Sequence, residues 1–179
     1  MTTFRKFTQM PRKFKNARII GIDPGYDRLG VAVIEKSLNE NKVIFSDCLI
    51  SNRKETLAER ITYLGEEISK IIKKYKPTVL AIEKIFFNEN QKTALAVAEL
   101  RGAIVYEGAK NGVKIFEYTP LEIKVAVTGY GRADKKQMIS LIPRLVKLPN
   151  KPKRLDDEFD AIATAITCLA REKLSYPHH

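Results

Sequence analysis

Short apolar runs and longer amphipathic segments alternate along this chain. Three runs rich in β-branched residues, at positions 17–23, 29–35 and 42–50, are joined by short links, which predicts three successive antiparallel strands. Leucine and isoleucine then recur at helical spacing over residues 56–74, before a proline that ends the helix. Residues 78–83 are apolar up to their last position and predict a buried strand.

The second half of the chain continues the alternation. Residues 90–110 form a helical segment that is apolar or small on most faces, which predicts burial on both sides, between its own sheet and a second subunit. Residues 113–118 predict a fifth strand. Capping signals and apolar spacing then predict three further helices, which begin at Thr119, at Asp134 and near Asp157.

Composition limits the class of protein. A chain of 179 residues with 44% hydrophobic content forms one domain with a sizeable core. Its two cysteines, Cys48 and Cys168, lie in apolar stretches without a CxxC partner, so neither a disulfide framework nor a zinc site is expected. No segment has the length of a membrane span or the form of a signal peptide. We therefore expect a soluble, intracellular protein without a membrane partner.

The net charge of +11 comes from two segments. Residues 1–18 carry six basic side chains and no acid, and residues 143–154 carry five and no acid, so the rest of the chain is balanced. The second segment ends beside a group of aspartates, where bound phosphate would border the chemistry. The first segment is open to several interpretations: a DNA-binding arm, a disordered tail or a transit peptide.

Acidic residues in three separate segments are the candidate catalytic groups. Asp23 and Glu83 each end an apolar strand, and Asp157 and Asp160 are three apart on one face of the last predicted helix. Each has an ordinary alternative role, as a turn residue, an ion-pair partner or a first-turn acid. Asp156 is four residues from Asp160 and would share its face, so spacing alone does not decide between Asp156 and Asp157. Converging carboxylates on a cationic chain predict metal-dependent chemistry on nucleic acid.

Four segments, in order, resemble the RuvC-type Holliday junction resolvases. They are IIGIDPGYDRLGVAVIE, AIEKIFFNENQKTALAVAELRGAI, TPLEIKVAVTGYGRADKKQM and LDDEFDAIATAIT, and the similarity runs from about residue 18 to residue 169. The resemblance implies a ribonuclease H-like α/β fold, with a mixed five-stranded sheet flanked by helices. It also implies one nuclease domain that covers residues 18–174. Residues 1–17 extend beyond the resemblance and are expected to form a flexible basic extension, and residues 175–179 are expected to form a tail. The terminal His178 and His179 are native or part of a tag.

The resemblance implies an endonuclease that acts as a homodimer and resolves four-way DNA junctions by symmetric paired nicks, in recombination and repair. Asp23, Glu83, Asp157 and Asp160 would be its catalytic and metal-binding residues, with two Mg²⁺ ions per site, for which Mn²⁺ can substitute. Similarity to the family motif selects Asp157 and leaves Asp156 or Glu158 as cap or solvent-facing acids. A branch-migration motor is a further implied partner, and the bacterial cytoplasm is the expected location, with an organelle as the alternative.

The expected DNA-binding residues come partly from the resemblance and partly from the charge pattern. Phe86 stands where the family carries an aromatic residue that stacks near the crossover, and Lys124 and Lys135 match family basic residues. Neighbouring cations complete the predicted set, which is Phe86, Lys124, Arg132, Lys135, Lys136, Lys151, Lys153 and Arg154.

Two other classes of protein remain as alternatives. A non-catalytic junction-binding protein would need the basic residues but not the acids. The GIDPG segment is also similar to the phosphate loop of actin-like ATPases, although a chain of 179 residues is short for their two lobes.

Overall fold

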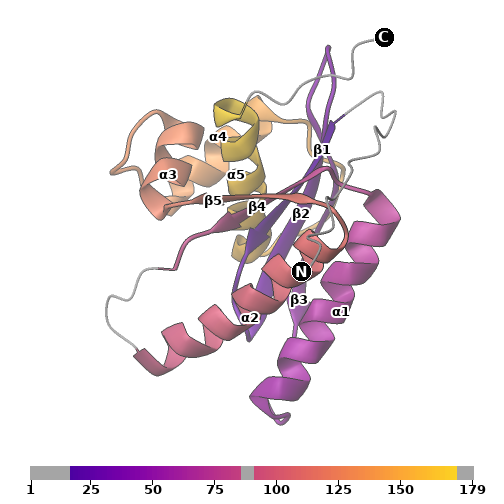
Figure 1. Ribbon diagram of the computed structural model, residues 1–179. Coiled ribbons are helices and arrows are strands. Elements are labelled where there is room, and N and C mark those ends of the chain that lie inside the picture. The colour runs from indigo at the N-terminus through magenta and orange to yellow at the C-terminus, as the bar shows by residue number, and fades with distance from the viewer. Residues whose placement is uncertain (1–16, 86–90, 173–179) are drawn as a thin grey trace, which may run out of the picture.

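One mixed five-stranded sheet organises the protein. The computed structural model of this chain describes residues 17–85 and 91–172 (Figure 1). The strands are β1 (Ala17–Asp23), β2 (Arg28–Lys36), β3 (Lys42–Ile50), β4 (Val79–Glu83) and β5 (Lys114–Tyr118). Their order in the sheet is β3-β2-β1-β4-β5. The first three pair antiparallel, as the short links predict, and β4 and β5 run parallel to β1.

Helices cover both faces of the sheet (Figure 1). They are α1 (Leu57–Tyr75), α2 (Gln91–Lys110), α3 (Pro120–Thr128), α4 (Lys135–Leu145) and α5 (Asp156–Arg171). Side chains of α1 and α2 complete one apolar core with Ile20, Ile22 and their neighbours. The other core lies on the opposite face, where α3, α4 and α5 pack. The predicted mixed sheet flanked by helices is confirmed. Within the described parts of the chain, no helix is long and apolar enough to cross a membrane.

Local capping explains where several helices begin. The predicted helix at Thr119 starts with a reciprocal capping box to Glu122, and the one at Asp134 starts with a box to Gln137. Each box satisfies main-chain N–H groups that the first helical turn leaves without partners. Helix α5 differs, because its N-cap residue Leu155 has an apolar side chain and makes no cap hydrogen bond with it.

Helix α5 sits unusually close to the sheet at two glycines. A Cβ atom on Gly21 would lie 2.2 Å from the carbonyl oxygen of Ala161, and one on Gly30 would lie 2.0 Å from that of Asp157. Real Cβ atoms do not approach so closely, so only glycine lets the helix backbone rest directly on β1 and β2. The close approach brings the first turns of α5 beside the end of β1.

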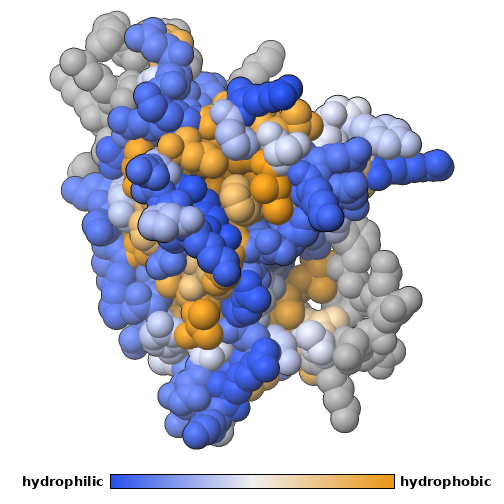
Figure 2. Space-filling model, turned by 180° about the vertical axis from the view of Figure 1, so that it is seen from behind, coloured by the Kyte–Doolittle hydropathy of each residue, from blue (hydrophilic) through white to orange (hydrophobic). Residues whose placement is uncertain are grey.

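The face covered by α3, α4 and α5 is partly apolar at its surface. Figure 2 shows apolar atoms gathered near the middle of this side, with hydrophilic atoms around them. Among the described residues, Leu121 and Val125 of α3 and Tyr130 just after it are exposed. Helix α3 therefore packs one side on the core and leaves apolar groups on its other side.

Candidate active site

Asp23 and Glu83 lie side by side at the carboxyl ends of two central strands of the sheet. They end the neighbouring parallel strands β1 and β4, and the preceding residues, Ile22 and Ile82, are partners in the ladder. Arg101 of α2 fixes the main chain there, because its Nε donates a 3.3 Å hydrogen bond to the carbonyl oxygen of Glu83. The two carboxyl groups therefore lie at the same end of two paired strands.

Helix α5 brings Asp157 and Asp160 to the same place. The main-chain carbonyl of Asp157 lies over Gly30, and Gly30 is the ladder partner of Asp23. Asp160 lies close enough to raise the pKa of both Asp23 and Glu83. The convergence that the sequence predicts for these acids is thus present in the folded chain.

Crowding in a low-dielectric setting changes the acidity of the cluster. Burial, followed by the nearby charges of Asp160, Glu83 and Asp157, raises the pKa of Asp23 to about 7. Burial and the charge of Asp160 likewise raise the pKa of Glu83 to about 7. Burial raises the pKa of Asp160 as well, against the opposing effect of a hydrogen bond from Lys135. Grouped, partly desolvated carboxylates ionise reluctantly unless a cation neutralises them.

Two basic side chains form ion pairs with the acidic cluster. The Lys135 ammonium donates a 2.7 Å hydrogen bond to Oδ2 of Asp160 and lies 3.7 Å from Oδ2 of Asp156. Arg28, at the start of β2, forms an ion pair with Asp157. The predicted N-cap Asp134 places Lys135 at the first position of α4. These contacts offset part of the repulsion within the cluster.

The structure separates the three consecutive acids at the start of α5. The side chain of Asp156 is 68% exposed, whereas that of Asp157 is 21% exposed. The charge of Asp157 helps to raise the pKa of Asp23, and the charge of Asp156 helps to raise the pKa of Asp160. Glu158 is buried and accepts a hydrogen bond from the main-chain N–H of Leu155, so it is a cap and not a solvent-facing acid. The geometry favours Asp157 as the partner of Asp160.

The donor set fits a hard divalent cation. All four groups offer carboxylate oxygens, which Mg²⁺ and similar ions prefer, and a bound cation would favour the ionised forms of Asp23 and Glu83. Over the described residues, no three His, Cys, Asp or Glu side chains are already gathered as a metal-binding group. Arg28 pairs with Oδ2 of Asp157 and Lys135 with Oδ2 of Asp160, so both basic side chains compete with a cation for these oxygens.

Comparison with known proteins identifies the family. The family model for the crossover junction endodeoxyribonuclease RuvC matches residues 19–168. The chain belongs to the RuvC family. A RuvC from Finegoldia magna is 36% identical over 89% of this chain and 96% of its own length. A RuvC from Desulforamulus reducens is 44% identical over 83% of this chain and 90% of its own.

Solved RuvC structures share the fold. Thermus thermophilus RuvC in complex with Holliday junction substrate superposes with a TM-score of 0.79 at 24% identity, over 86% of this chain and 93% of that chain. A second Thermus thermophilus RuvC structure gives 0.75 at 25% identity, over 85% and 93%. The ribonuclease H-like fold expected from the sequence is confirmed, and membership of the RuvC family supports use of a divalent metal.

A buried arginine that the sequence interpretation missed holds the turn after Asp23. Arg60 of α1 is 8% exposed, donates to Oγ of Ser51 over 2.9 Å and to the carbonyl oxygen of Tyr26 over 3.0 Å, and pairs with Asp27. Arg60 stands four residues before the buried Leu64, on the apolar side of the helix, and this spacing could have indicated that Arg60 is buried. These contacts of Arg60 fix the turn between Asp23, at the end of β1, and Arg28.

The predicted DNA-binding residues of this RuvC-family chain fall into separate groups. Phe86 lies outside the described residues. Arg132, Lys136 and Lys153 are exposed, and Lys124 is half-buried on α3. Lys135 contacts the acid cluster. Lys151 and Arg154 instead contact their own chain, at Glu158 and at the carbonyl oxygen of Pro149 respectively.

Proposed function

We propose that this protein is a structure-selective endonuclease that resolves four-way DNA junctions by paired symmetric nicks, in homologous recombination and repair. The observation that carries the proposal is the convergence of Asp23, Glu83, Asp157 and Asp160 at one sheet edge of a RuvC-family fold. Junction DNA as substrate is supported by the Thermus thermophilus relative, which was solved with a Holliday junction.

The proposed metal is Mg²⁺, two ions per site, with Mn²⁺ as a substitute. Asp23, Glu83, Asp157 and Asp160 would hold it. When bound, such ions activate water and stabilise the leaving oxygen of a phosphodiester. Asp23 and Glu83 form the inner, more desolvated side of the site, with pKa values near 7, and so release their protons in the neutral range. Lys135 starts α4, where helix N–H groups favour a phosphate, and is suited to receive one when it leaves Asp160.

The proposed DNA contacts follow the exposed cations near this site. Arg132 and Lys136 flank the start of α4, and Lys124 lies on the preceding helix. Phe86 is proposed to stack at the crossover, on the basis of its place after Glu83 in the sequence. Lys153 extends the positive surface next to α5. Each phosphate contact should contribute to the salt dependence of junction binding.

We further propose a homodimer, because two active sites related by a two-fold axis suit symmetric nicking. Helix α2 supports this arrangement, because it leaves large apolar side chains uncovered that a second subunit could cover. Leu95 and Tyr106 are 60% and 62% exposed. A branch-migration motor remains a proposed partner, and the organisms of the relatives favour a bacterial cytoplasm. Residues 1–17 are proposed as a basic extension of the single domain over 18–174, with 175–179 as a tail.

A cleavage assay tests the function. Labelled four-way junction, plain duplex and single strand are incubated with wild type, Asp23→Asn and the matched control Asp156→Asn, with and without Mg²⁺. We expect symmetric nicks in the junction alone, lost in Asp23→Asn although junction binding persists, and retained in Asp156→Asn. Binding without nicking by wild type would favour a non-catalytic junction-binding protein. Equal cutting of all substrates would indicate a general nuclease, and nucleotide binding without DNA would revive the actin-like alternative.

A further inference from the structure

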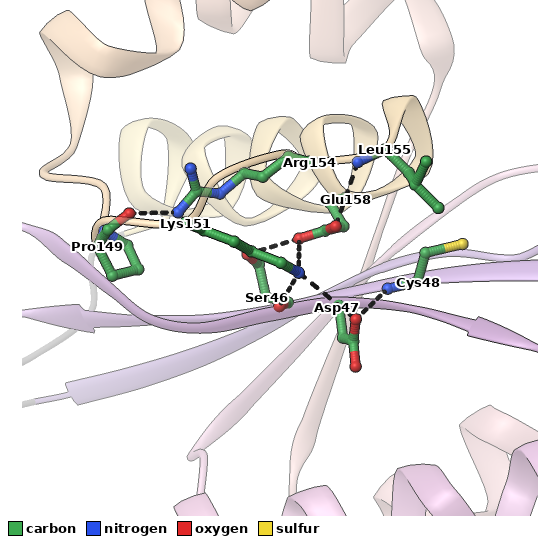
Figure 3. Close-up of polar contacts among 8 residues, drawn as sticks. All are labelled: Ser46, Asp47, Cys48, Pro149, Lys151, Arg154, Leu155 and Glu158. Carbon is green, nitrogen blue, oxygen red and sulfur yellow. Dashed lines mark hydrogen bonds and ion pairs between the residues drawn. The ribbon is translucent and has the colours of Figure 1, made fainter.

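Glu158 is a buried carboxylate that lies between two catalytic acids in the sequence. The residue is 2% exposed, yet both its oxygens have partners. Oε1 accepts from the main-chain N–H of Leu155 over 3.2 Å, and Oε2 accepts from Oγ of Ser46 over 2.9 Å and from Nζ of Lys151 over 2.8 Å (Figure 3). A buried charge is tolerated only when it is paired and hydrogen-bonded in this way.

The partners of Glu158 come from three separate segments. Ser46 belongs to the edge strand β3, Leu155 is the N-cap residue before α5, and Lys151 lies in the basic segment between α4 and α5. That segment follows the outer side of β3: the N–H of Val43 donates to the carbonyl oxygen of Lys147 and the N–H of Lys147 to that of Asn41, both over 2.9 Å. The Lys151–Glu158 pair therefore joins the sheet edge to the first turn of α5.

The ammonium group of Lys151 makes all its described contacts within this chain, around Glu158. Besides Glu158, its ammonium donates to the carbonyl oxygen of Ser46 over 3.3 Å and lies 3.5 Å from Oδ1 of Asp47 (Figure 3). Moving it to a DNA phosphate would leave the carboxylate of Glu158 buried without its cation, which is strongly unfavourable. Lys151 thus differs from Lys153, which is exposed two residues further along.

We propose that Lys151 and Glu158 are a positioning pair for Asp157 and Asp160, and that Lys151 is not a phosphate contact. The inference rests on the proposed function of that acid cluster. Helix α5 lacks a side-chain cap from Leu155, so Glu158 supplies the hydrogen bond to its first turn. Lys151 holds Glu158 toward β3, and this sets the rotation of the turn that points the two flanking aspartates at Asp23. Removal of a group that orients a metal ligand without contacting the metal typically lowers metal affinity or activity about 10–100-fold.

The test compares Lys151→Met, Glu158→Gln and the double variant with wild type, and with Lys73→Met as a control at the exposed, far end of α1. Three quantities are measured: Mn²⁺ affinity without DNA by electron paramagnetic resonance, the salt dependence of junction binding without metal, and the single-turnover nicking rate at saturating junction. For Lys151→Met we expect about tenfold weaker Mn²⁺ binding and about tenfold slower nicking. The slope of log affinity against log salt should equal that of wild type. Lys73→Met should match wild type in Mn²⁺ affinity and nicking rate.

The double variant keeps the test valid if Lys151→Met folds poorly, because it leaves no unpaired buried charge. Its loss of Mn²⁺ affinity should be no larger than that of the worse single variant, since both residues act as one unit. A salt slope smaller by about 1 with unchanged Mn²⁺ affinity would identify Lys151 as a phosphate contact and overturn the proposal. A lower melting temperature with unchanged Mn²⁺ affinity and nicking rate would overturn it too. The metal and salt measurements need no cleavage, so they decide the question even if wild type cuts no junction.

Discussion

Removing the charge of Asp23 should stabilise the metal-free protein at alkaline pH. Burial and the neighbouring acids raise the pKa of this group from 3.8 to about 7. Between these values the folded state holds a proton that the unfolded state has released. The free energy of unfolding of the metal-free protein therefore falls as pH rises through this window, and it stays low above pH 7. Asp23→Asn carries no such charge and escapes the loss.

The size of the effect follows from the shift. At about 1.36 kcal/mol per pKa unit, a rise from 3.8 to about 7 corresponds to about 4 kcal/mol as an upper limit. Glu83 is raised to about 7 by the same crowding, and Asp23 is partly exposed, so the two contributions overlap and are screened. We therefore expect about 1–3 kcal/mol for the substitution. In a chain of 179 residues this corresponds to a melting temperature higher by about 3–10 °C.

Differential scanning calorimetry in EDTA between pH 4.5 and 8.5 checks this expectation. The melting temperature of Asp23→Asn minus that of wild type should be small at pH 4.5 and should grow to its full positive value above pH 7. Adding Mg²⁺ at pH 8.5 should raise the melting temperature of wild type more than that of the variant, because binding to the folded state stabilises it. Asp156→Asn is the control and should show no such pH-dependent gain. A variant that is less stable than wild type at pH 8.5 would refute the reasoning.

Other predictions concern the supports of the cluster. Gly30→Ala should cost about 1–3 kcal/mol in urea unfolding and abolish nicking, because its Cβ would meet the carbonyl oxygen of Asp157 at 2.0 Å; normal activity would contradict the close seating of α5. Asp157→Asn should lower the nicking rate at least about 100-fold whereas Asp156→Asn changes it little, and equal losses would count against this assignment. Arg28→Met should tighten Mn²⁺ binding in titration calorimetry, since it frees an oxygen of Asp157. Unchanged affinity would show that Arg28 does not compete with the metal for Asp157.

Most of the fold could be predicted because its signals are local. Strands β1 and β3 lie where apolar runs placed them, and the capping boxes at Thr119 and Asp134 start helices as expected. Asp23 and Glu83 could be expected to converge because each ends an apolar strand, and the parallel pairing of β1 with β4 brings the two strand ends together.

The supporting contacts were not predictable, because they join residues far apart in the chain. Ser46 and Glu158 are 112 positions apart, and Arg28 and Asp157 are 129 positions apart. A glutamate in a run of first-turn acids has the pattern of a solvent-facing residue, and only the edge of β3 makes it a buried one. Lys151 has the same basic character in sequence as Lys153. What separates the two is which of them reaches that carboxylate.

The acid cluster is unfavourable by itself, and its surroundings explain how it persists. Burial and mutual repulsion raise the pKa of both Asp23 and Glu83 to about 7, because water does not fully solvate these carboxyl groups. Such a site keeps its geometry only if neighbouring structure fixes it. Three features do so from different directions: the clamp of Arg60 on the turn after β1, the seating of α5 on Gly21 and Gly30, and the Lys151–Glu158 pair. Because all three contact segments next to the proposed metal-binding acids, changes in them should alter metal binding as well as stability.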